Sequence, residues 1–173
     1  MTSKKFLNSL ARGKKDILEV FLDILAQSGR KYCLIGGMAV NAYAEPVVSL
    51  DLGIVIAAGR LAAVLEAAAK HGFKAKRFET SVNLTRPDSD LRIQIQTDDR
   101  YQDFIPSAVT KNILGYRMKV AAVEDVLKGK IWAFSDEKRR MSKRHKDAAD
   151  IMRLIETYPR LKGKMPAVLR KKI

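Results

Sequence analysis

Apolar side chains recur along the first thirty residues at the three- and four-residue spacing of an amphipathic helix. The pattern breaks at Gly13 and ends at Ser28-Gly29, where a glycine suits the end of a helix. The spacing therefore predicts two helices, each with one apolar face on a core. Their apolar positions are Phe6, Leu7, Leu10, Ile17, Leu18, Phe21, Leu22 and Leu25.

The pattern changes from helical to extended after this region. Residues 32–35 form a short apolar run that predicts a buried strand. The pair Gly36-Gly37 predicts a turn, and residues 38–44 predict a short helix that ends before Pro46. This part of the chain is therefore expected to form a strand, a glycine turn and a helix.

Residues 49–56 alternate between apolar and other side chains. One face holds Leu50, Leu52, Ile54 and Ile56, and the other holds Ser49, Asp51 and Gly53. Because successive side chains of a strand point to opposite faces, the run predicts a half-buried strand. Its open face carries the carboxylate of Asp51. Without further evidence, an aspartate at this place is also typical of an ordinary exposed strand residue.

The remaining pattern predicts a helix at 61–70, strands at 73–79, 81–86 and 90–97, a hairpin or bend at 112–120, and helices at 123–134 and 137–158. In the strand at 90–97, Arg92, Gln94 and Gln96 share the face opposite the apolar side chains. We therefore expect an α/β (α+β) protein with a mixed β-sheet flanked by helices. The expected divisions are N-terminal helices at 1–30, an α/β core at 31–122, C-terminal helices at 123–158 and a basic tail at 159–173.

The chain has 173 residues, of which 47% are hydrophobic and 30% charged, so it suits one globular domain and not a disordered chain. The formal net charge is +14, and more than half of this excess lies in residues 121–173. Such a charge attracts polyanions. In the basic run at 138–146 the candidate contacts to RNA or DNA phosphates are Arg139, Arg140, Lys143 and Arg144, although a charge run is also typical of a solvated helix face.

The single cysteine, Cys33, lies inside an apolar run and is expected to be a buried, reduced thiol. No stretch reaches the roughly 18 apolar residues that cross a bilayer. We therefore expect a cytoplasmic protein with no membrane partner.

The glycine pair and the acidic strand together resemble the opening motif of the DNA polymerase β type nucleotidyltransferases. The resemblance is to small bacterial members related to abortive-infection and toxin–antitoxin proteins. In that family a Gly-Gly or Gly-Ser pair and a short helix precede two acidic residues separated by one apolar residue, and here residues 35–43 and 49–55 take these places. Residues 130–133 and 144–151 resemble two later helices of the family. The resemblance implies the nucleotidyltransferase fold, with a nucleotide or nucleic-acid phosphate and a cognate toxin or antitoxin as partners.

The chemistry of that family assigns roles to individual residues. Two Mg²⁺ ions held by carboxylates neutralise a nucleoside triphosphate and activate the attacking hydroxyl. The resemblance implies that Asp51 is the catalytic, metal-binding carboxylate and that Lys130 and Asp147 are catalytic pocket residues. It also implies that Gly36, Gly37 and Ser49 bind the nucleotide. Each role has an alternative. The glycines form only a tight turn, and the hydroxyl of Ser49 is an ordinary strand side chain. Lys143 and Asp147, like Lys146 and Asp150, form surface ion pairs.

The sequence departs from the family at the remaining acidic positions. Gly53 stands where the second carboxylate is expected, and Gln94 where the third is expected. Mg²⁺ prefers hard oxygen ligands, so one carboxylate and one amide are expected to bind it only weakly and not as a pair of ions. Arg92, on the same face, is expected to pair with Asp51 and to take over the electrostatic role of the metal.

Three functions remain open from the sequence. The first is a nucleotidyltransferase-like protein with depleted catalytic carboxylates that binds a nucleotide or nucleic acid. The second is an active metal-dependent enzyme that moves a nucleoside monophosphate from a triphosphate onto RNA, a protein or a small molecule. The third is a basic nucleic-acid-binding scaffold without a nucleotide pocket.

Overall fold

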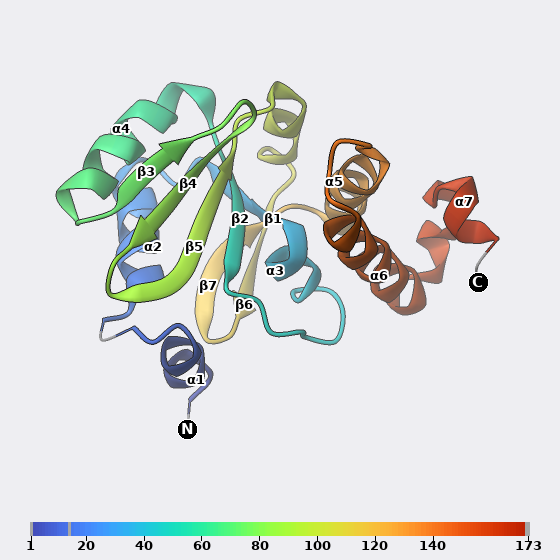
Figure 1. Ribbon diagram of the computed structural model, residues 1–173, viewed down its shortest axis with the longest axis horizontal. Coiled ribbons are helices and arrows are strands. Elements are labelled where there is room, and N and C mark those ends of the chain that lie inside the picture. Colours follow the sequence, from blue (N-terminus) through green and yellow to red (C-terminus); the bar gives the residue numbers. More distant parts are fainter. Residues whose placement is uncertain (1, 14, 172–173) are drawn as a thin grey trace.

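A seven-stranded mixed β-sheet forms the centre of the protein, as a computed structural model shows for residues 2–13 and 15–171 (Figure 1). The strand order is β3-β4-β5-β2-β1-β7-β6. Strand β2 runs antiparallel to β1 and parallel to β5, and β1 runs parallel to β7. The strands are β1 (Tyr32–Ile35), β2 (Asp51–Ile56), β3 (Lys74–Arg77), β4 (Ser81–Arg86), β5 (Ser89–Gln96), β6 (Val109–Ile113) and β7 (Tyr116–Val120). The expected α/β architecture is confirmed.

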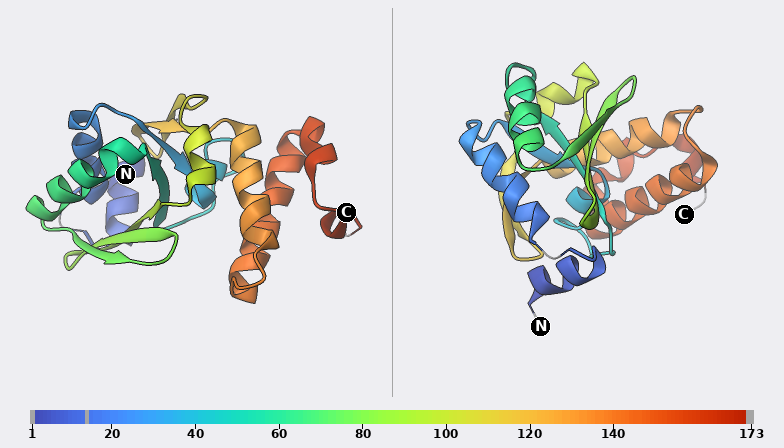
Figure 2. Two further views of the ribbon diagram at one scale, coloured as in Figure 1. Left: turned by 90° about the horizontal axis from the view of Figure 1, so that it is seen from above. Right: turned by 60° about the vertical axis from the view of Figure 1, so that its left-hand side comes forward.

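Helices cover both faces of this sheet. Figures 1 and 2 show α2 and α4 on one face, and α3, α5 and α6 on the other, with α7 at the C-terminal end. The helices are α1 (Ser3–Leu10), α2 (Ile17–Gln27), α3 (Gly36–Val40), α4 (Ala58–Lys70), α5 (Val123–Ser135), α6 (Met141–Thr157) and α7 (Ala167–Arg170). Two 3₁₀-helices span Asp99–Phe104 and Pro159–Lys164.

Capping side chains fix where the first two helices begin. The side chain of Thr2 accepts a hydrogen bond from the amide of Lys5, and the side chain of Asp16 accepts one from the amide of Glu19. Each cap satisfies one backbone donor that a helix leaves unpaired. The predicted break at Gly13 is confirmed, because α1 ends before it and α2 begins after it.

The alternation along the two central strands is also confirmed. Leu52 and Ile54 of β2, with Ile93 and Ile95 of β5, are fully buried. The opposite face of β5 carries Arg92, Gln94 and Gln96, which are partly or fully exposed. The sheet therefore presents a polar face toward α5 and α6, as a period of two requires.

Several boundaries differ from the sequence prediction. The helix expected at 38–44 begins at Gly36 and ends at Val40, and the helix expected at 137–158 begins at Met141. The 3₁₀-helix at Asp99–Phe104 was not predicted. It forms because Tyr101 and Phe104 pack on Trp132 of α5, with ring centroids 5.1 and 5.6 Å away, and such long-range aromatic contacts leave no local periodicity. The last segment packs as well, since it buries Leu161, Met165 and Leu169.

The structure places Cys33 in the core, with none of its surface exposed. Burial, together with the charge of Asp125, raises the pKa of its thiol to about 12. The thiol is therefore protonated at neutral pH and acts as a small apolar side chain. No helix in the described part of the chain is both long enough and apolar enough to cross a membrane.

Candidate functional site

A cleft of about 570 Å³ lies between the polar face of the sheet and the first turns of α6. The basic side chains that line it are Arg92, Lys130, Arg139, Arg140, Lys143 and Lys146, and the carboxylates are Asp51, Asp147 and Asp150. The lining also contains Gly36, Gly37, Ser49, Gly53, Phe78, Asn83 and Gln94. Cations outnumber carboxylates, so the cleft attracts anions.

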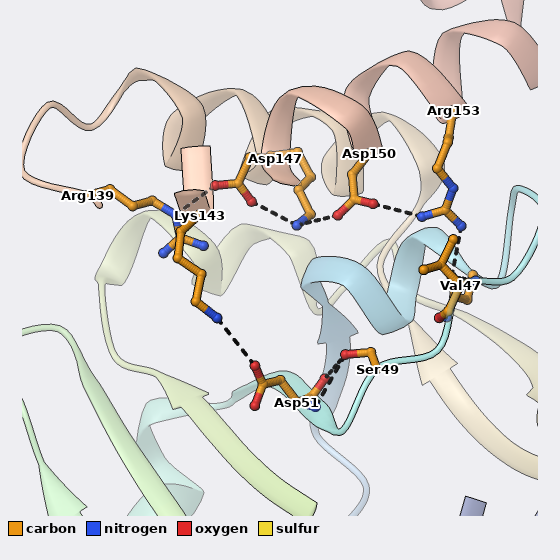
Figure 3. Close-up of polar contacts among 10 residues, drawn as sticks. Val47, Ser49, Asp51, Arg139, Lys143, Asp147, Asp150 and Arg153 are labelled. Atoms are coloured by element: carbon orange, nitrogen blue, oxygen red, sulfur yellow. Dashed lines mark hydrogen bonds and ion pairs between the residues drawn. The ribbon is translucent and has the colours of Figure 1, made fainter. Parts of the chain in front are cut away.

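Asp51 begins β2 on the floor of this cleft, and its neighbour in the parallel register is Arg92 of β5. The guanidinium of Arg92 contacts Oδ1 of Asp51 through Nε at 2.9 Å and Nη2 at 2.7 Å. Lys143 reaches down from α6, and its Nζ lies 3.6 Å from Oδ2 (Figure 3). The expected pair between Asp51 and Arg92 is present, and each carboxylate oxygen faces a fixed cation.

Gly53 and Gln94 are also register neighbours on β2 and β5. The two positions at which the resemblance implies carboxylates therefore adjoin on the cleft face, and both side chains there are uncharged. A Cβ at Gly53 would lie 3.2 Å from the carbonyl oxygen of Ile35, a contact tighter than ordinary packing. A larger side chain would require the end of β1 to shift.

These residues do not fit a pair of divalent metal ions. Mg²⁺ takes six oxygen ligands and is usually held by carboxylates, phosphates and water. On the floor of the cleft only Asp51 supplies a carboxylate, and two cations already contact it. Within residues 2–13 and 15–171 no group of three or more histidine, cysteine or acidic residues is placed to hold a metal.

The opposite wall contains a buried network of ion pairs (Figure 3). Nζ of Lys130 lies 2.9 Å from Oδ1 of Asp147 and 2.7 Å from Oδ2 of Asp150. Nε of Arg139 lies 2.6 Å from the other oxygen of Asp147, and Nη1 of Arg153 lies 2.7 Å from Oδ1 of Asp150. Lys130 and Asp147 are only 7% and 1% exposed, so the pair at the centre of this network joins α5 to α6 largely shielded from solvent.

Lys130 and Asp147, the predicted pocket residues, thus lie at the cleft but bind each other. Both oxygens of Asp147 are occupied by Lys130 and Arg139. The alternative of surface ion pairs four residues apart is wrong, because Lys143 contacts Asp51, and Asp150 contacts Lys130 and Arg153 in place of Lys146. The reason is burial: Asp147 faces α5, and a buried carboxylate needs cations in direct contact to compensate its charge.

Arg153 extends this network to the loop that leads into β2. Its Nη2 lies 2.9 Å from Oδ1 of Asn41, and it also donates to the carbonyl oxygen of Glu45. The side chain of Asn41 in turn binds the backbone N–H and C=O of Val47 at 3.0 and 2.7 Å. Helix α6 therefore fixes the loop that positions the floor of the cleft.

Gly36, Gly37 and Ser49, the residues expected to bind a nucleotide, all line the cleft. Gly36 has a φ of +70°, a conformation that a glycine adopts without strain. Asp150 stands against Gly37, since its Oδ2 lies 3.7 Å from the position of a Cβ there. The hydroxyl of Ser49 accepts a hydrogen bond from the amide of Asp51 and donates one to its carbonyl oxygen, each at 3.2 Å. This hydroxyl therefore shapes the turn before β2.

The four residues expected to contact nucleic acid have different surroundings. Arg139 and Lys143 contact carboxylates of the cleft. Nε of Arg144 donates to the carbonyl oxygen of Phe134 at 2.8 Å. Arg140 lines the cleft, and no ion pair to it is formed within the described part of the chain. Three of these side chains are therefore held by partners inside the protein.

Sequence reasoning missed other members of the cleft. Phe78, in the turn between β3 and β4, is 50% exposed, and Oδ1 of Asn83 is buried without a hydrogen-bond partner among the described residues. No local pattern signals either of them. Asp150 did carry a signal, because it lies three residues after Asp147 and therefore on the same helix face.

A smaller pocket of about 110 Å³ adjoins the cleft and shares Gln94 and Lys130 with it. Its own lining includes Gln96, Tyr101 and Asp125. Burial raises the pKa of Tyr101 to about 12, so its hydroxyl stays protonated at neutral pH. The pocket therefore adds the uncharged hydrogen-bonding groups of Gln96 and Tyr101 and the carboxylate of Asp125 to the side chains of the cleft.

Solved structures of the proteins ANT(2'')-Ia and LnuA have the same architecture as this chain. The antibiotic-resistance factor ANT(2'')-Ia matches in its solution structure with a TM-score of 0.62 at 11% identity, over 90% of this chain and 88% of that chain. Its complex with adenylyl-2''-tobramycin matches with a TM-score of 0.62 at 13% identity, over 90% and 94%. The lincomycin-bound lincosamide antibiotic adenylyltransferase LnuA matches with a TM-score of 0.56 at 15% identity, over 82% and 98%. The chain therefore has the nucleotidyltransferase fold.

No protein-family model matches the sequence, and no curated protein is significantly similar to it.

Proposed function

We propose that this protein binds a nucleotide in the cleft and that its catalytic carboxylates are depleted. The observation that carries the proposal is the charge of the cleft, where six basic side chains face three carboxylates. Carboxylates at the two depleted positions, 53 and 94, would raise the acidic count to five and bring the lining close to neutral. A ligand with several negative charges, such as a nucleoside triphosphate, compensates the excess of positive charge.

Two of the cleft cations are available to such a ligand. Arg140 and Lys146 line the cleft from the start of α6, and neither forms an ion pair within residues 2–13 and 15–171. Arginine and lysine both bind phosphate oxygens through charge-assisted hydrogen bonds. The start of α6 is therefore the expected position of the phosphates.

Two further side chains favour a nucleotide over a simple polyanion. Phe78 presents a half-exposed ring at the cleft, and an aromatic ring is a stacking surface for a base. Oδ1 of Asn83 has no hydrogen-bond partner among residues 2–13 and 15–171, although buried polar atoms are nearly always hydrogen-bonded. An exocyclic amine, as in adenine or cytosine, would supply the missing donor, so ATP is a suitable probe.

Replacing Phe78 by alanine is expected to weaken ATP binding about 5- to 100-fold, because base stacking contributes roughly 1–3 kcal/mol. The same change is expected to leave the affinity for inorganic tripolyphosphate unaltered, since that ion has no base. Isothermal titration calorimetry with both ligands measures the two effects.

Phe6→Ala is the matched control, because it removes a similarly exposed ring from α1, outside the cleft. Equal losses for ATP and tripolyphosphate in Phe78→Ala would contradict stacking. Failure of the unmodified protein to bind either ligand would contradict the proposed function.

A second candidate is transfer of a nucleoside monophosphate, which the adenylyltransferase LnuA supports as a neighbour in fold. The protein is incubated with radiolabelled nucleoside triphosphates, Mg²⁺ or Mn²⁺, and total RNA. We expect no label on RNA or protein. Incorporation that Asp51→Ala abolishes would overturn the depleted-site proposal in favour of the enzyme.

A relationship of this protein to toxin–antitoxin and abortive-infection proteins rests on the sequence resemblance alone and stays a prediction. Contact of Arg139, Arg140, Lys143 and Arg144 with RNA or DNA phosphates stays a prediction as well. Such contacts would make affinity fall steeply with salt, with a slope of log K against log[salt] of about −0.9 per phosphate on duplex DNA.

A further inference from the structure

We propose that Arg92 and Lys143 replace the metal ions of this cleft, so that the protein binds nucleotide phosphates without a divalent cation. This inference rests on the proposed function and adds to it how the phosphate charge is neutralised.

The first step is the position of the two cations. Arg92 projects from the floor on β5, and Lys143 projects from the opposite wall on α6. They approach different oxygens of Asp51, Oδ1 at 2.7 Å and Oδ2 at 3.6 Å. Two positive charges therefore stand on either side of the one carboxylate that the floor retains, where a metal-dependent site would place its ions.

The second step is that these cations oppose a metal ion. A divalent cation at Asp51 would approach a guanidinium and an ammonium that already contact both oxygens. Repulsion between like charges is largest at such short range. Gly53 and Gln94 provide no negative charge to offset it.

The third step is that both side chains remain accessible to a ligand. The side chains of Arg92 and Lys143 are 43% and 32% exposed, and both line the cleft. A guanidinium has five N–H donors and an ammonium has three, so each retains donors beyond its contact with Asp51. These donors supply to phosphate oxygens the charge neutralisation that a metal would supply.

The test compares ATP binding by isothermal titration calorimetry in EDTA and in excess MgCl₂ at equal ionic strength. We expect ATP to bind in EDTA at least as tightly as in MgCl₂, because Mg²⁺ masks the phosphate charge that Arg92 and Lys143 recognise. Asp51→Asn is expected to tighten binding up to about fivefold, since it releases Arg92 from an ion pair worth up to about 1 kcal/mol. Arg92→Ala is expected to weaken binding at least about tenfold, through the loss of a hydrogen bond to a charged group.

Glu66→Gln is the matched control for Asp51→Asn, because it also removes one negative charge but lies on α4, away from the cleft. Urea unfolding of each variant confirms that the fold is intact. Binding that occurs only in MgCl₂, or that Asp51→Asn abolishes, would overturn the inference and leave nucleotide binding standing. Absence of binding in both buffers would overturn the proposed function itself.

Discussion

Asp147→Ala is expected to lower the free energy of unfolding by about 3–5 kcal/mol, the cost of removing one partner from a buried ion pair. Asp147 is 1% exposed and compensates two cations, Lys130 at 2.9 Å and Arg139 at 2.6 Å. Without it, Lys130 keeps only Asp150 as a partner, and its ammonium remains in a dry environment between α5 and α6. Urea denaturation followed by circular dichroism measures the loss.

Glu66→Ala is the matched control for this variant. It also removes one partner of a lysine ion pair, but Glu66 and Lys70 are both 71% exposed on α4. An exposed pair of this type contributes roughly 0.3–0.5 kcal/mol. Similar losses in Asp147→Ala and Glu66→Ala would show that the network of Lys130 is hydrated and not buried.

The double replacement Arg140→Ala/Lys146→Ala is expected to weaken ATP binding at least about 100-fold. Each side chain is placed to donate a hydrogen bond to a phosphate, and a hydrogen bond to a charged group contributes about 1.5–3 kcal/mol. Neither forms an ion pair within the described residues, so their removal leaves no carboxylate of the cleft uncompensated. The free energy of unfolding should therefore change little while the affinity falls.

Lys162→Ala/Lys164→Ala provides the comparison. It removes the same amount of charge from the exposed 3₁₀-helix Pro159–Lys164, which does not line the cleft. Calorimetric titration of both double variants with ATP separates a local contact from the general effect of net charge. Equal losses would place the phosphates outside the cleft.

The spacing of apolar residues predicted most of the helices and strands, because the buried face of each element is encoded within that element. The alternation in β2 and β5 located the core face and the polar face correctly, and the glycine pair marked the passage from β1 to α3, although both glycines belong to the helix and not to a separate turn. Boundaries were less well predicted where tertiary contacts decide them. The 3₁₀-helix at Asp99–Phe104 depends on the stacking of Phe104 against Trp132, which no local pattern encodes.

The composition of the floor of the candidate site could also be predicted from sequence. Strand alternation placed Arg92 on the polar face, so its pairing with Asp51 was expected, whereas the parallel register that sets Gly53 beside Gln94 is seen only in the structure. The contribution of the β3–β4 hairpin could not be predicted in the same way. Phe78 and Asn83 reach the cleft through the path of the β3–β4 hairpin, and the sequence contains no signal for that path.

The sequence by itself determined that one carboxylate, Asp51, stands on the polar face of a strand beside a glycine pair, because strand alternation is a local property. The tertiary structure decided what that carboxylate contacts. Arg92 is 41 residues away along the chain and Lys143 lies on α6, yet both reach Asp51. It also decided that Asp147 is buried against Lys130 and not paired with Lys143 at the surface. Ion pairs of this kind depend on which elements pack together, and packing is a property of the whole chain.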